Sequence, residues 1–351
     1  MGNIVSNDFP VWGRTIVITG GSSGLGLAAG RLLAEKGANI VIVARDQDKL
    51  YQGLEYIRQC AVDPQEQRFH QISADLISPS ESARVIDEVV SWNLGNPPDV
   101  VWCCAGSTHP SLFIDTPVSE FNKQMNNNYF TSLYMAHATL TCWLRTSRKG
   151  MNSSSSTTLP TETPTTRVRS SIPARHIIFT ASFLALYSFA GWSPYSPSKA
   201  ALRTLSDCLS QEMNLYASAY PNEPAIRFHT IFPATIFSES YEVETRMKSD
   251  LMKVLEGPDD GQTPEVVAAL SIKGLESGQE LITTEILSTM VKRSVLGGSV
   301  RGGFWMVIWD WILACVMGIV MVFVRDDMDR KTRAWGRKYG ASAMKIGNKQ
   351  D

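Results

Sequence analysis

The chain carries little charge and no excess of either sign. Its 351 residues include 33 Lys+Arg and 34 Asp+Glu, which leave a formal net charge of −1. Because a basic footprint is missing, we expect no nucleic-acid partner. Only 19% of the residues are charged, below the roughly 25% of soluble domains, which indicates one unusually apolar segment. A hydrophobic content of 44% excludes disorder as the state of the whole chain.

Cysteines are also few. They have neither the density of a disulfide scaffold nor the paired C-x-x-C spacing of a structural zinc site, so we predict reduced thiols and no metal. Adjacent Cys103 and Cys104 follow an apolar run, and we interpret them as small residues at a buried strand end rather than as nucleophiles. The six cysteines are Cys60, Cys103, Cys104, Cys142, Cys208 and Cys315.

A secretory signal is absent from the start of the sequence. The stretch Met1–Pro10 is polar and lacks an apolar core segment. The opening MGNIVS does match the N-myristoylation pattern M-G-x-x-x-[ST] through Gly2 and Ser6. Because a six-residue pattern often arises by chance, we favour an ordinary frayed terminus over residues 1–13, with acylation of Gly2 as the alternative.

Short apolar runs alternate with helix-length segments from Arg14 onward. The runs Thr15–Thr19 and Ile40–Ala44 flank a glycine-rich turn and a helix, which makes a βαβ unit with a right-handed crossover. We therefore predict an α/β domain over 14–300, a doubly wound parallel sheet of the Rossmann type. Further strands are expected at Val100–Cys104, His176–Thr180 and Ile226–Ile231.

A Ser/Thr/Pro-rich insertion interrupts the domain at 147–173. It contains almost no large apolar groups, so its burial could not offset the entropy of ordering it. We expect a mobile, disordered loop. It precedes a strand, which places it at the end of the sheet away from the ligand-binding edge.

The apolar segment that explains the low charge content lies at 301–325. Phe304–Val324 has about the length that a helix needs to cross roughly 30 Å of hydrocarbon, and Asp310 is its single charge. Trp305, Trp309 and Trp311 cluster at one end like an interfacial belt. We predict a membrane-anchoring helix, with a buried core helix as the alternative.

The orientation of this helix stays open. Lys and Arg are more frequent in the basic, polar tail 326–351 than before the apolar run, so a single span would place the tail in the cytosol and the large domain opposite it. Reduced thiols and a cytosolic cofactor pool favour a cytosolic domain instead. An interfacial or re-entrant helix would be consistent with both the charge distribution and a cytosolic domain.

The turn after the first strand reads T-G-x-x-x-G-x-G. Glycines allow a pyrophosphate to approach the backbone closely, and the following helix N-terminus offers free N–H groups. Its position between a strand and a helix predicts dinucleotide binding. The residues expected to contribute are Gly20, Ser22, Ser23, Gly24 and Gly26.

The second strand ends in Ala44-Arg45-Asp46. An acid at this strand tip would select NAD, whereas Arg45 can pair with a 2′-phosphate, so NADPH is the predicted cofactor. The alternative is that Arg45 is a solvated loop charge and that Asp46 caps the next helix. Further on, Asp75 and Leu76 are expected to flank the adenine, and Ala105 and Gly106 to allow close backbone approach.

The catalytic signal is Ser182 together with Y-S-P-S-K at 195–199. Tyr195 and Lys199 are four residues apart on a helix, so the ammonium can approach the phenol and lower its pKa from about 10. Pro197 is tolerated in a first turn, which places Tyr195 at the helix start. Tyr195 then serves as an acid near neutrality, and Ser182 can donate to a substrate oxygen.

Together these motifs over residues 14–240 resemble the short-chain dehydrogenase/reductase family. The resemblance implies that Tyr195 is the general acid, that Lys199 also binds the nicotinamide ribose and that Ser182 holds the carbonyl. It further implies that Asn128, in N-N-N-Y, holds a proton-relay water. The chain departs from the family pattern at two places. Cys104-Ala105-Gly106 replaces the usual N-A-G. Pro233-Ala234-Thr235 replaces the usual P-G, so only Pro233 and Thr235 are expected to contact the nicotinamide.

Within the family, TGGSSGLG, VARD, NNYF, YSPSK and the C-terminal apolar segment are most similar to a membrane-attached lipid reductase. The resemblance implies NADPH-dependent reduction of a long-chain sphingoid ketone at the cytosolic face of the endoplasmic reticulum membrane. A steroid, retinoid or other lipid carbonyl is the alternative substrate, and a non-catalytic NADPH-binding scaffold is the alternative function. Family members commonly pair through the helices that carry the asparagine and the tyrosine, so a homo-oligomer is also expected.

Overall fold

The computed structural model describes residues 7–152, 172–220, 222–257, 261–295 and 304–339. The MGNIVS pattern, most of the Ser/Thr/Pro-rich insertion and the last part of the basic tail lie outside the described residues.

Seven parallel strands form one sheet in the order β3-β2-β1-β4-β5-β6-β7. The reversal of strand order between β1 and β4 is the topological switch point at which open α/β sheets bind ligands. The doubly wound fold that we expected is therefore confirmed. The strands are β1 (Thr15–Thr19), β2 (Asn39–Ala44), β3 (Phe69–Ser73), β4 (Val100–Cys103), β5 (Arg175–Thr180), β6 (Ile226–Phe232) and β7 (Leu281–Thr283).

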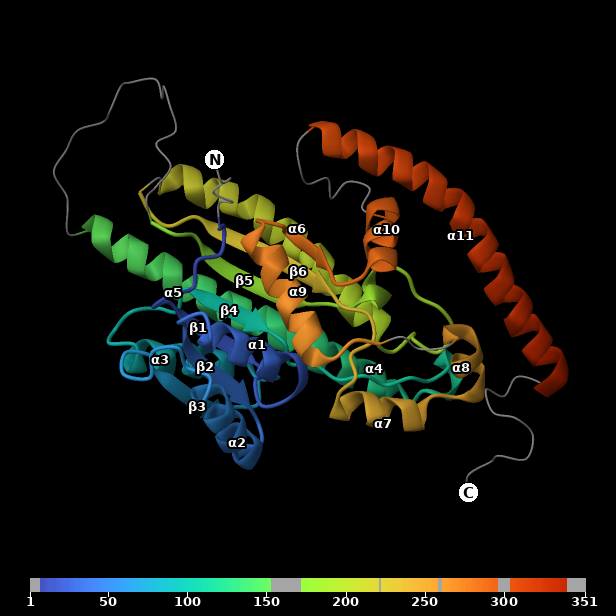
Figure 1. Ribbon diagram of the computed structural model, residues 1–351, viewed down its shortest axis with the longest axis horizontal. Helices are drawn as coiled ribbons and strands as arrows, with labels where there is room; N and C mark the ends of the chain where they lie inside the picture. The colour runs from blue at the N-terminus through green and yellow to red at the C-terminus, as the bar shows by residue number, and fades with distance from the viewer. Residues whose placement is uncertain (1–6, 153–171, 221, 258–260, 296–303, 340–351) are drawn as a thin grey trace.

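The helices connect these strands and extend beyond the last of them (Figure 1). They are α1 (Gly24–Ala34), α2 (Gln47–Arg58), α3 (Pro79–Trp92), α4 (Val118–Met125), α5 (Thr131–Asn152), α6 (Ser196–Ala219), α7 (Glu239–Met247), α8 (Asp250–Glu256), α9 (Pro264–Glu276), α10 (Ile286–Val295) and α11 (Phe304–Tyr339). Three short helical segments are η1 (Phe113–Asp115), η2 (Asn126–Phe130) and η3 (Phe183–Ala185).

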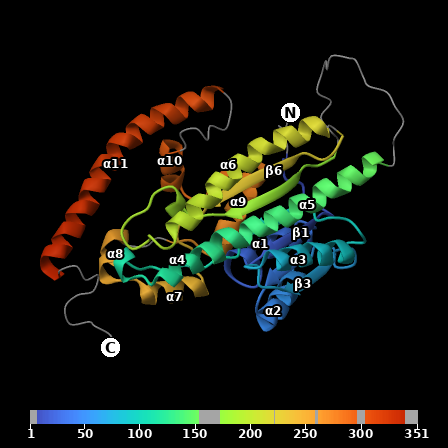
Figure 2. The same cartoon turned by 180° about the vertical axis from the view of Figure 1, so that it is seen from behind.

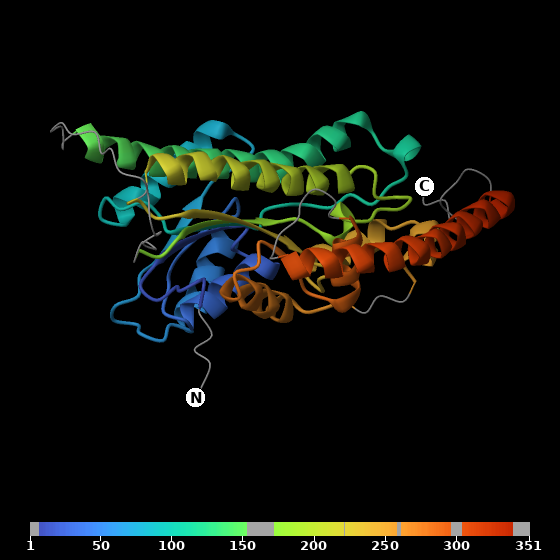
Figure 3. The same cartoon turned by 90° about the horizontal axis from the view of Figure 1, so that it is seen from above.

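Two apolar cores enclose the sheet. Side chains of α1, α2 and α9 pack against one face, and those of α3, α5 and α6 pack against the other. Figure 3 shows α5 and α6 on one side of the sheet and α1 and α9 on the opposite side, and Figure 2 shows α5 and α6 running beside each other. Because both faces are covered, the central strands read as continuous apolar runs, which is why their positions could be predicted.

The predicted loop at 147–173 begins with helix. Helix α5 continues to Asn152, so its last turns occupy the start of that range. The serines of this segment do not exclude a helix, since the helix is propagated from the buried turns before it. Strand β5 begins at Arg175, at the edge of the sheet opposite the strand C-termini, as expected.

Helix α11 is the one helix among the described residues that is long and apolar enough to cross a membrane. Within Trp305–Trp335, its most apolar window of 18 residues has a mean hydropathy of 2.4, and only 6% of that window is buried. The helix continues to Tyr339, beyond the expected end of the anchor at 325, and so includes part of the basic tail. It runs along the outside of the domain next to α10 and α8 (Figure 1).

Candidate active site

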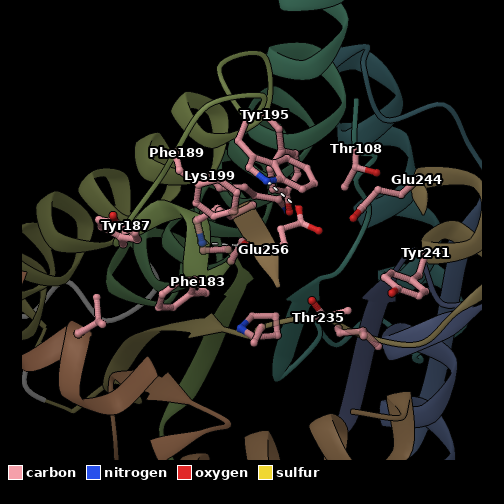
Figure 4. A pocket seen from close by; sticks show the side chains of 18 of the residues that line it. Thr108, Phe183, Tyr187, Phe189, Tyr195, Lys199, Thr235, Tyr241, Glu244 and Glu256 are labelled. Carbon is pink, nitrogen blue, oxygen red and sulfur yellow. Dashed lines mark hydrogen bonds between the residues drawn. The ribbon is translucent and has the colours of Figure 1, made fainter. Parts of the chain in front are cut away.

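A cavity of about 510 Å³ opens beyond the C-terminal ends of the strands. Residues following β4, β5 and β6 form its floor, and α6 supplies one wall. Side chains of α7, α8, α10 and α11 close the remaining sides. Figure 4 shows the side chains that converge there. The cavity therefore lies where the switch-point rule places a ligand.

The glycine turn lacks room for side chains. Gly20 has a φ of +66°, and a Cβ there would lie 2.9 Å from the Cα of Ala105. A Cβ on Gly26 would overlap the carbonyl oxygen of Gly20. Helix α1 begins at Gly24, directly after Ser22 and Ser23, so its free N–H groups face the turn. This cradle fits the pyrophosphate of a dinucleotide.

The residues expected around the adenosine lie at the same edge of the sheet. Arg45 follows β2 and is exposed, while Asp46 accepts a hydrogen bond from the Lys49 N–H and caps α2. The helix-cap role that we considered for Asp46 is confirmed. Asp75 is exposed and Leu76 is buried just after β3.

The catalytic motif residues converge in the cavity. Tyr195 is the N-cap residue of α6, with Pro197 in the first turn, as the sequence predicted. Ser182 follows β5, lines the same cavity and lies near enough to Tyr195 to affect its pKa. Lys199 is only 4% exposed, and its Nζ donates to the Thr180 carbonyl oxygen at 2.8 Å.

The predicted lowering of the Tyr195 pKa is wrong. Burial raises the pKa of this phenol, the neighbouring Ser182 hydroxyl only partly opposes that effect, and the charge of Glu244 raises it further. The ammonium of Lys199 lies 5.7 Å from the centre of the Tyr195 ring and is directed to Thr180 instead. Burial also lowers the pKa of Lys199 to about 8.

Asn128 is fully buried within η2, a π-helical turn. Its Oδ1 accepts from the Ser107 N–H at 2.8 Å, and its Nδ2 donates to the Ser107 carbonyl oxygen at 2.9 Å. A Cβ on Gly106 would lie 2.6 Å from Asn128 Oδ1 and 3.3 Å from Lys199 Nζ, so the three residues are neighbours. Among the three consecutive asparagines, Asn128 is the one that lines the cavity.

The two departures from the family pattern leave the cavity intact. Cys104 replaces the expected asparagine, and it accepts a long hydrogen bond of 3.5 Å from the Thr180 hydroxyl. Burial raises the pKa of the Cys104 thiol to about 12, which fits an inert structural residue. Pro233 and Thr235 both line the cavity, and the Pro233 carbonyl accepts from the Phe183 N–H.

A charged group in the cavity was not predicted. Lys248, at the end of α7, lies 2.9 Å from both Glu244 and Glu256. The Trp192 indole donates to Glu256 at 3.2 Å. These residues come from α7, α8 and the loop before α6, and their spacing in the sequence matches no motif. Only the fold brings them together.

Another part of the cavity lining is apolar. Helix α10 contributes Leu287 and Val291, and one face of α11 contributes its remaining wall. The α11 side chains recur at helical spacing, so they lie on one stripe of that helix. They are Met317, Val320, Met321, Val324 and Met328. The cavity lining thus combines polar groups around Tyr195 with an apolar wall supplied by α10 and α11.

Comparisons with known proteins identify the relatives of this chain. The short chain dehydrogenase family model matches residues 14–158. A 3-ketodihydrosphingosine reductase of Aspergillus fumigatus is 46% identical over 95% of this chain and 88% of its own length. Its counterpart in Neurospora crassa is 35% identical over 95% of this chain and 85% of its own, and that of Cryptococcus neoformans is 33% identical over 92% and 86%.

Solved structures show the same fold at lower identity. A short-chain type dehydrogenase/reductase from Mycobacterium marinum aligns with a TM-score of 0.61 and 21% identity, over 79% of this chain and 96% of that one. One from Mycobacterium ulcerans aligns with a TM-score of 0.59 and 19% identity, over 78% and 89%. The sheet order, the converging motif residues and the similarity to relatives over nearly the whole chain lead to one conclusion: this chain belongs to the short-chain dehydrogenase/reductase family of NAD(P)-dependent oxidoreductases.

Proposed function

We propose that this protein is an NADPH-dependent 3-ketodihydrosphingosine reductase, which forms dihydrosphingosine in sphingolipid biosynthesis. The observation that carries the proposal is the shape of the cavity, which joins Tyr195 and Lys199 to an apolar end along α11. A long-chain ketone needs both ends. Three relatives that bear this enzyme's name and match the chain over most of its length support the choice of substrate.

Each polar residue at the Tyr195 end has a role in this reaction. The Tyr195 hydroxyl donates a proton to the ketone oxygen, and Ser182 donates a hydrogen bond to the same oxygen as negative charge develops there. Lys199 holds the nicotinamide ribose, and buried Asn128 holds a water of the proton relay. The bound nicotinamide would supply the hydride. Pro233 and Thr235 line its side of the cavity.

The choice of NADPH rests on the end of β2. Ala44 stands where NAD-specific sheets carry an acid, and the exposed guanidinium of Arg45 follows at once. A guanidinium can form two parallel hydrogen bonds to a phosphate, which suits the 2′-phosphate of NADPH. Ser22 and Ser23 in the neighbouring turn supply further donors.

We place the protein at the endoplasmic reticulum membrane with the catalytic domain toward the cytosol. The outer face of α11 supports attachment to a bilayer, because Trp305 is 75% exposed and Phe323 is 68% exposed. A substrate with a long alkyl chain partitions into lipid, so an enzyme held at the bilayer meets it at a high local concentration. Dimerisation through α5 and α6 remains a family-based proposal.

One assay tests substrate, cofactor and mechanism together. The full-length protein in detergent is given 3-ketodihydrosphingosine with NADPH or NADH, and cofactor absorbance is followed. We expect rapid oxidation of NADPH, slower oxidation of NADH and formation of dihydrosphingosine. Tyr195→Phe should lose on the order of 10²-fold or more in rate, because the general acid is gone, while NADPH binding by fluorescence and the melting temperature are retained.

Other outcomes would overturn the proposal. Faster reduction of a ketosteroid or a retinal than of 3-ketodihydrosphingosine would assign a different lipid carbonyl as the substrate. Cofactor binding without oxidation by any ketone would indicate a non-catalytic scaffold. Substantial turnover by Tyr195→Phe would contradict the assigned general acid even if the substrate is right.

A further inference from the structure

The polar end of the cavity holds two carboxylates that share one ammonium. Lys248 is only 4% exposed, and its Nζ lies 2.9 Å from Glu244 Oε1 and 2.9 Å from Glu256 Oε2. The side chains of Glu244 and Glu256 are 14% and 17% exposed. One lysine balances one carboxylate, so with both carboxylates ionised this mostly buried group carries a net charge of −1.

The two carboxylates differ in how their oxygens are used. Glu256 accepts from Lys248 with one oxygen and from the Trp192 indole with the other. Glu244 is ion-paired with Lys248 through Oε1, and within the described part of the chain no residue other than Lys248 forms a hydrogen bond or ion pair with its carboxylate. Lys199 does not supply one, since its Nζ is directed to the Thr180 carbonyl. Glu244 therefore retains an acceptor for a further cation.

This acceptor lies beside the reacting groups. Glu244, Glu256 and Tyr195 all line the cavity, and Figure 4 shows them converging on it. The ring of Trp192, which holds Glu256, is 5.7 Å from the ring of Tyr195. The charge of Glu244 reaches the Tyr195 hydroxyl strongly enough to raise its pKa. A cation bound by Glu244 would sit next to the oxygen that Tyr195 protonates.

The substrate class of the proposed function carries such a cation. A sphingoid ketone has a primary ammonium on the carbon next to its carbonyl carbon, so the two groups must bind side by side. A buried carboxylate with a free acceptor is a suitable partner for an ammonium. A steroid or retinoid carbonyl has no cation to place there, and it would leave Glu244 desolvated without a new partner.

We propose that Glu244, oriented by Lys248 and Glu256, binds the ammonium of the substrate and makes the enzyme selective for 2-amino ketones over neutral ketones. This inference rests on the proposed function and deepens it. Lys248 has a positioning role, because its ion pairs hold Glu244 and Glu256 in the wall of the cavity. The apolar face of α11 at the other end then receives the alkyl chain.

The test compares two substrates that differ only in the amino group. One is 3-ketodihydrosphingosine, and the other is its analogue with hydrogen in place of the amine. For the full-length protein, kcat/KM should be higher for the amino ketone. Glu244→Gln should lower the ratio of the two kcat/KM values on the order of tenfold to a hundredfold, the effect of a charge-assisted hydrogen bond. Glu244→Asp should restore part of the ratio.

The ratio separates recognition from a general loss of structure. A variant that merely misfolds or disturbs Tyr195 lowers both kcat/KM values and leaves their ratio unchanged, and that result would overturn the inference. Glu239→Gln is the matched control, because Glu239 lies on the same helix but is paired with Lys49 at the surface. Its ratio should equal that of the wild type. Should the wild type reduce neither ketone, the proposed function itself fails.

Discussion

Lys199 is a buried side chain whose charged form is disfavoured by its surroundings. It is 4% exposed, and its Nζ has one carbonyl partner and no carboxylate among the described residues. Burial lowers its pKa to about 8 from an ordinary value of 10.5. The folded chain therefore holds this proton less tightly than the unfolded chain does, and stability becomes linked to pH.

The sign of this linkage gives the first prediction. Between pH 8 and pH 10.5 the unfolded state binds more protons at Lys199, so its contribution to stability rises as pH rises through this window. The free energy of unfolding of the wild type minus that of Lys199→Met should increase by on the order of 3 kcal/mol from pH 8 to pH 10.5. Urea titrations of both ligand-free proteins measure it. A difference that stays constant with pH would contradict the assigned burial effect.

Arg45 allows a test of cofactor choice at a single position. It is exposed, so Arg45→Glu should hardly change stability. The new acid would repel a 2′-phosphate and accept hydrogen bonds from a ribose, so the NADPH-to-NADH ratio of kcat/KM should fall at least about tenfold. Arg58→Glu makes the same charge change at the far end of α2 and serves as the control. An unchanged ratio for Arg45→Glu would leave Arg45 as a solvated loop charge.

Single residues were predictable where chemistry is encoded in local spacing. Tyr195 and Lys199 are one helical turn apart, and the glycines of the first turn lie between a strand and a helix, so their roles follow from neighbours in the sequence. Glu244 and Glu256 belong to different helices. Glu244 affects the pKa of Tyr195, and Glu256 accepts from Trp192, so both act on residues distant in the sequence. The pKa of Tyr195 was mispredicted for a related reason, because burial is a property of the assembled fold.

Among the elements, α11 has two apolar faces with different environments. Met317 is only 5% exposed on the inner face, and Trp335 is buried against Leu251 and Leu255 of α8. The outer face is open, with Val322 65% exposed. The single charge of the apolar run, Asp310, lies 3.6 Å from Arg293 of α10, so it is directed to the domain.

Filling the inner face of α11 should shorten the substrates that fit. Met321→Trp adds bulk to the apolar end of the cavity, and overpacking of this kind costs about 1–3 kcal/mol. We expect kcat/KM for the long-chain ketone to fall about tenfold while that of a short-chain 2-amino ketone changes little. Val322→Trp, on the outer face, is the control. Equal losses with both chain lengths would show that α11 does not receive the alkyl chain.

The elements were predicted least well where composition misleads. The range 301–325 was chosen by hydropathy, but α11 continues to Tyr339 because its charged turns form i,i+4 pairs such as Asp326–Arg330 and Asp327–Lys331. The same limitation affected the start of the insertion, where α5 extends to Asn152. Strand β7 has three residues and left no recognisable period.

At the scale of the whole molecule, the fold followed from pattern because each buried strand of the parallel sheet is a separate apolar run. The switch point then fixes which edge binds ligands, so the positions of the cofactor turn and of Tyr195 follow from topology. The shape of the cavity did not follow, since it depends on how α7, α8, α10 and α11 return over that edge.

With α11 at a bilayer, as we propose, its inner stripe would give the lipid a direct part in catalysis. A helix that borders lipid on one side and the reaction chamber on the other would let a ketone slide in without its tail crossing water. Rate would then follow the mole fraction of ketone in the surface rather than its bulk concentration. Added inert lipid would slow the enzyme by dilution within two dimensions, and a detergent tail lodged between Met317 and Met328 would act as a competitor.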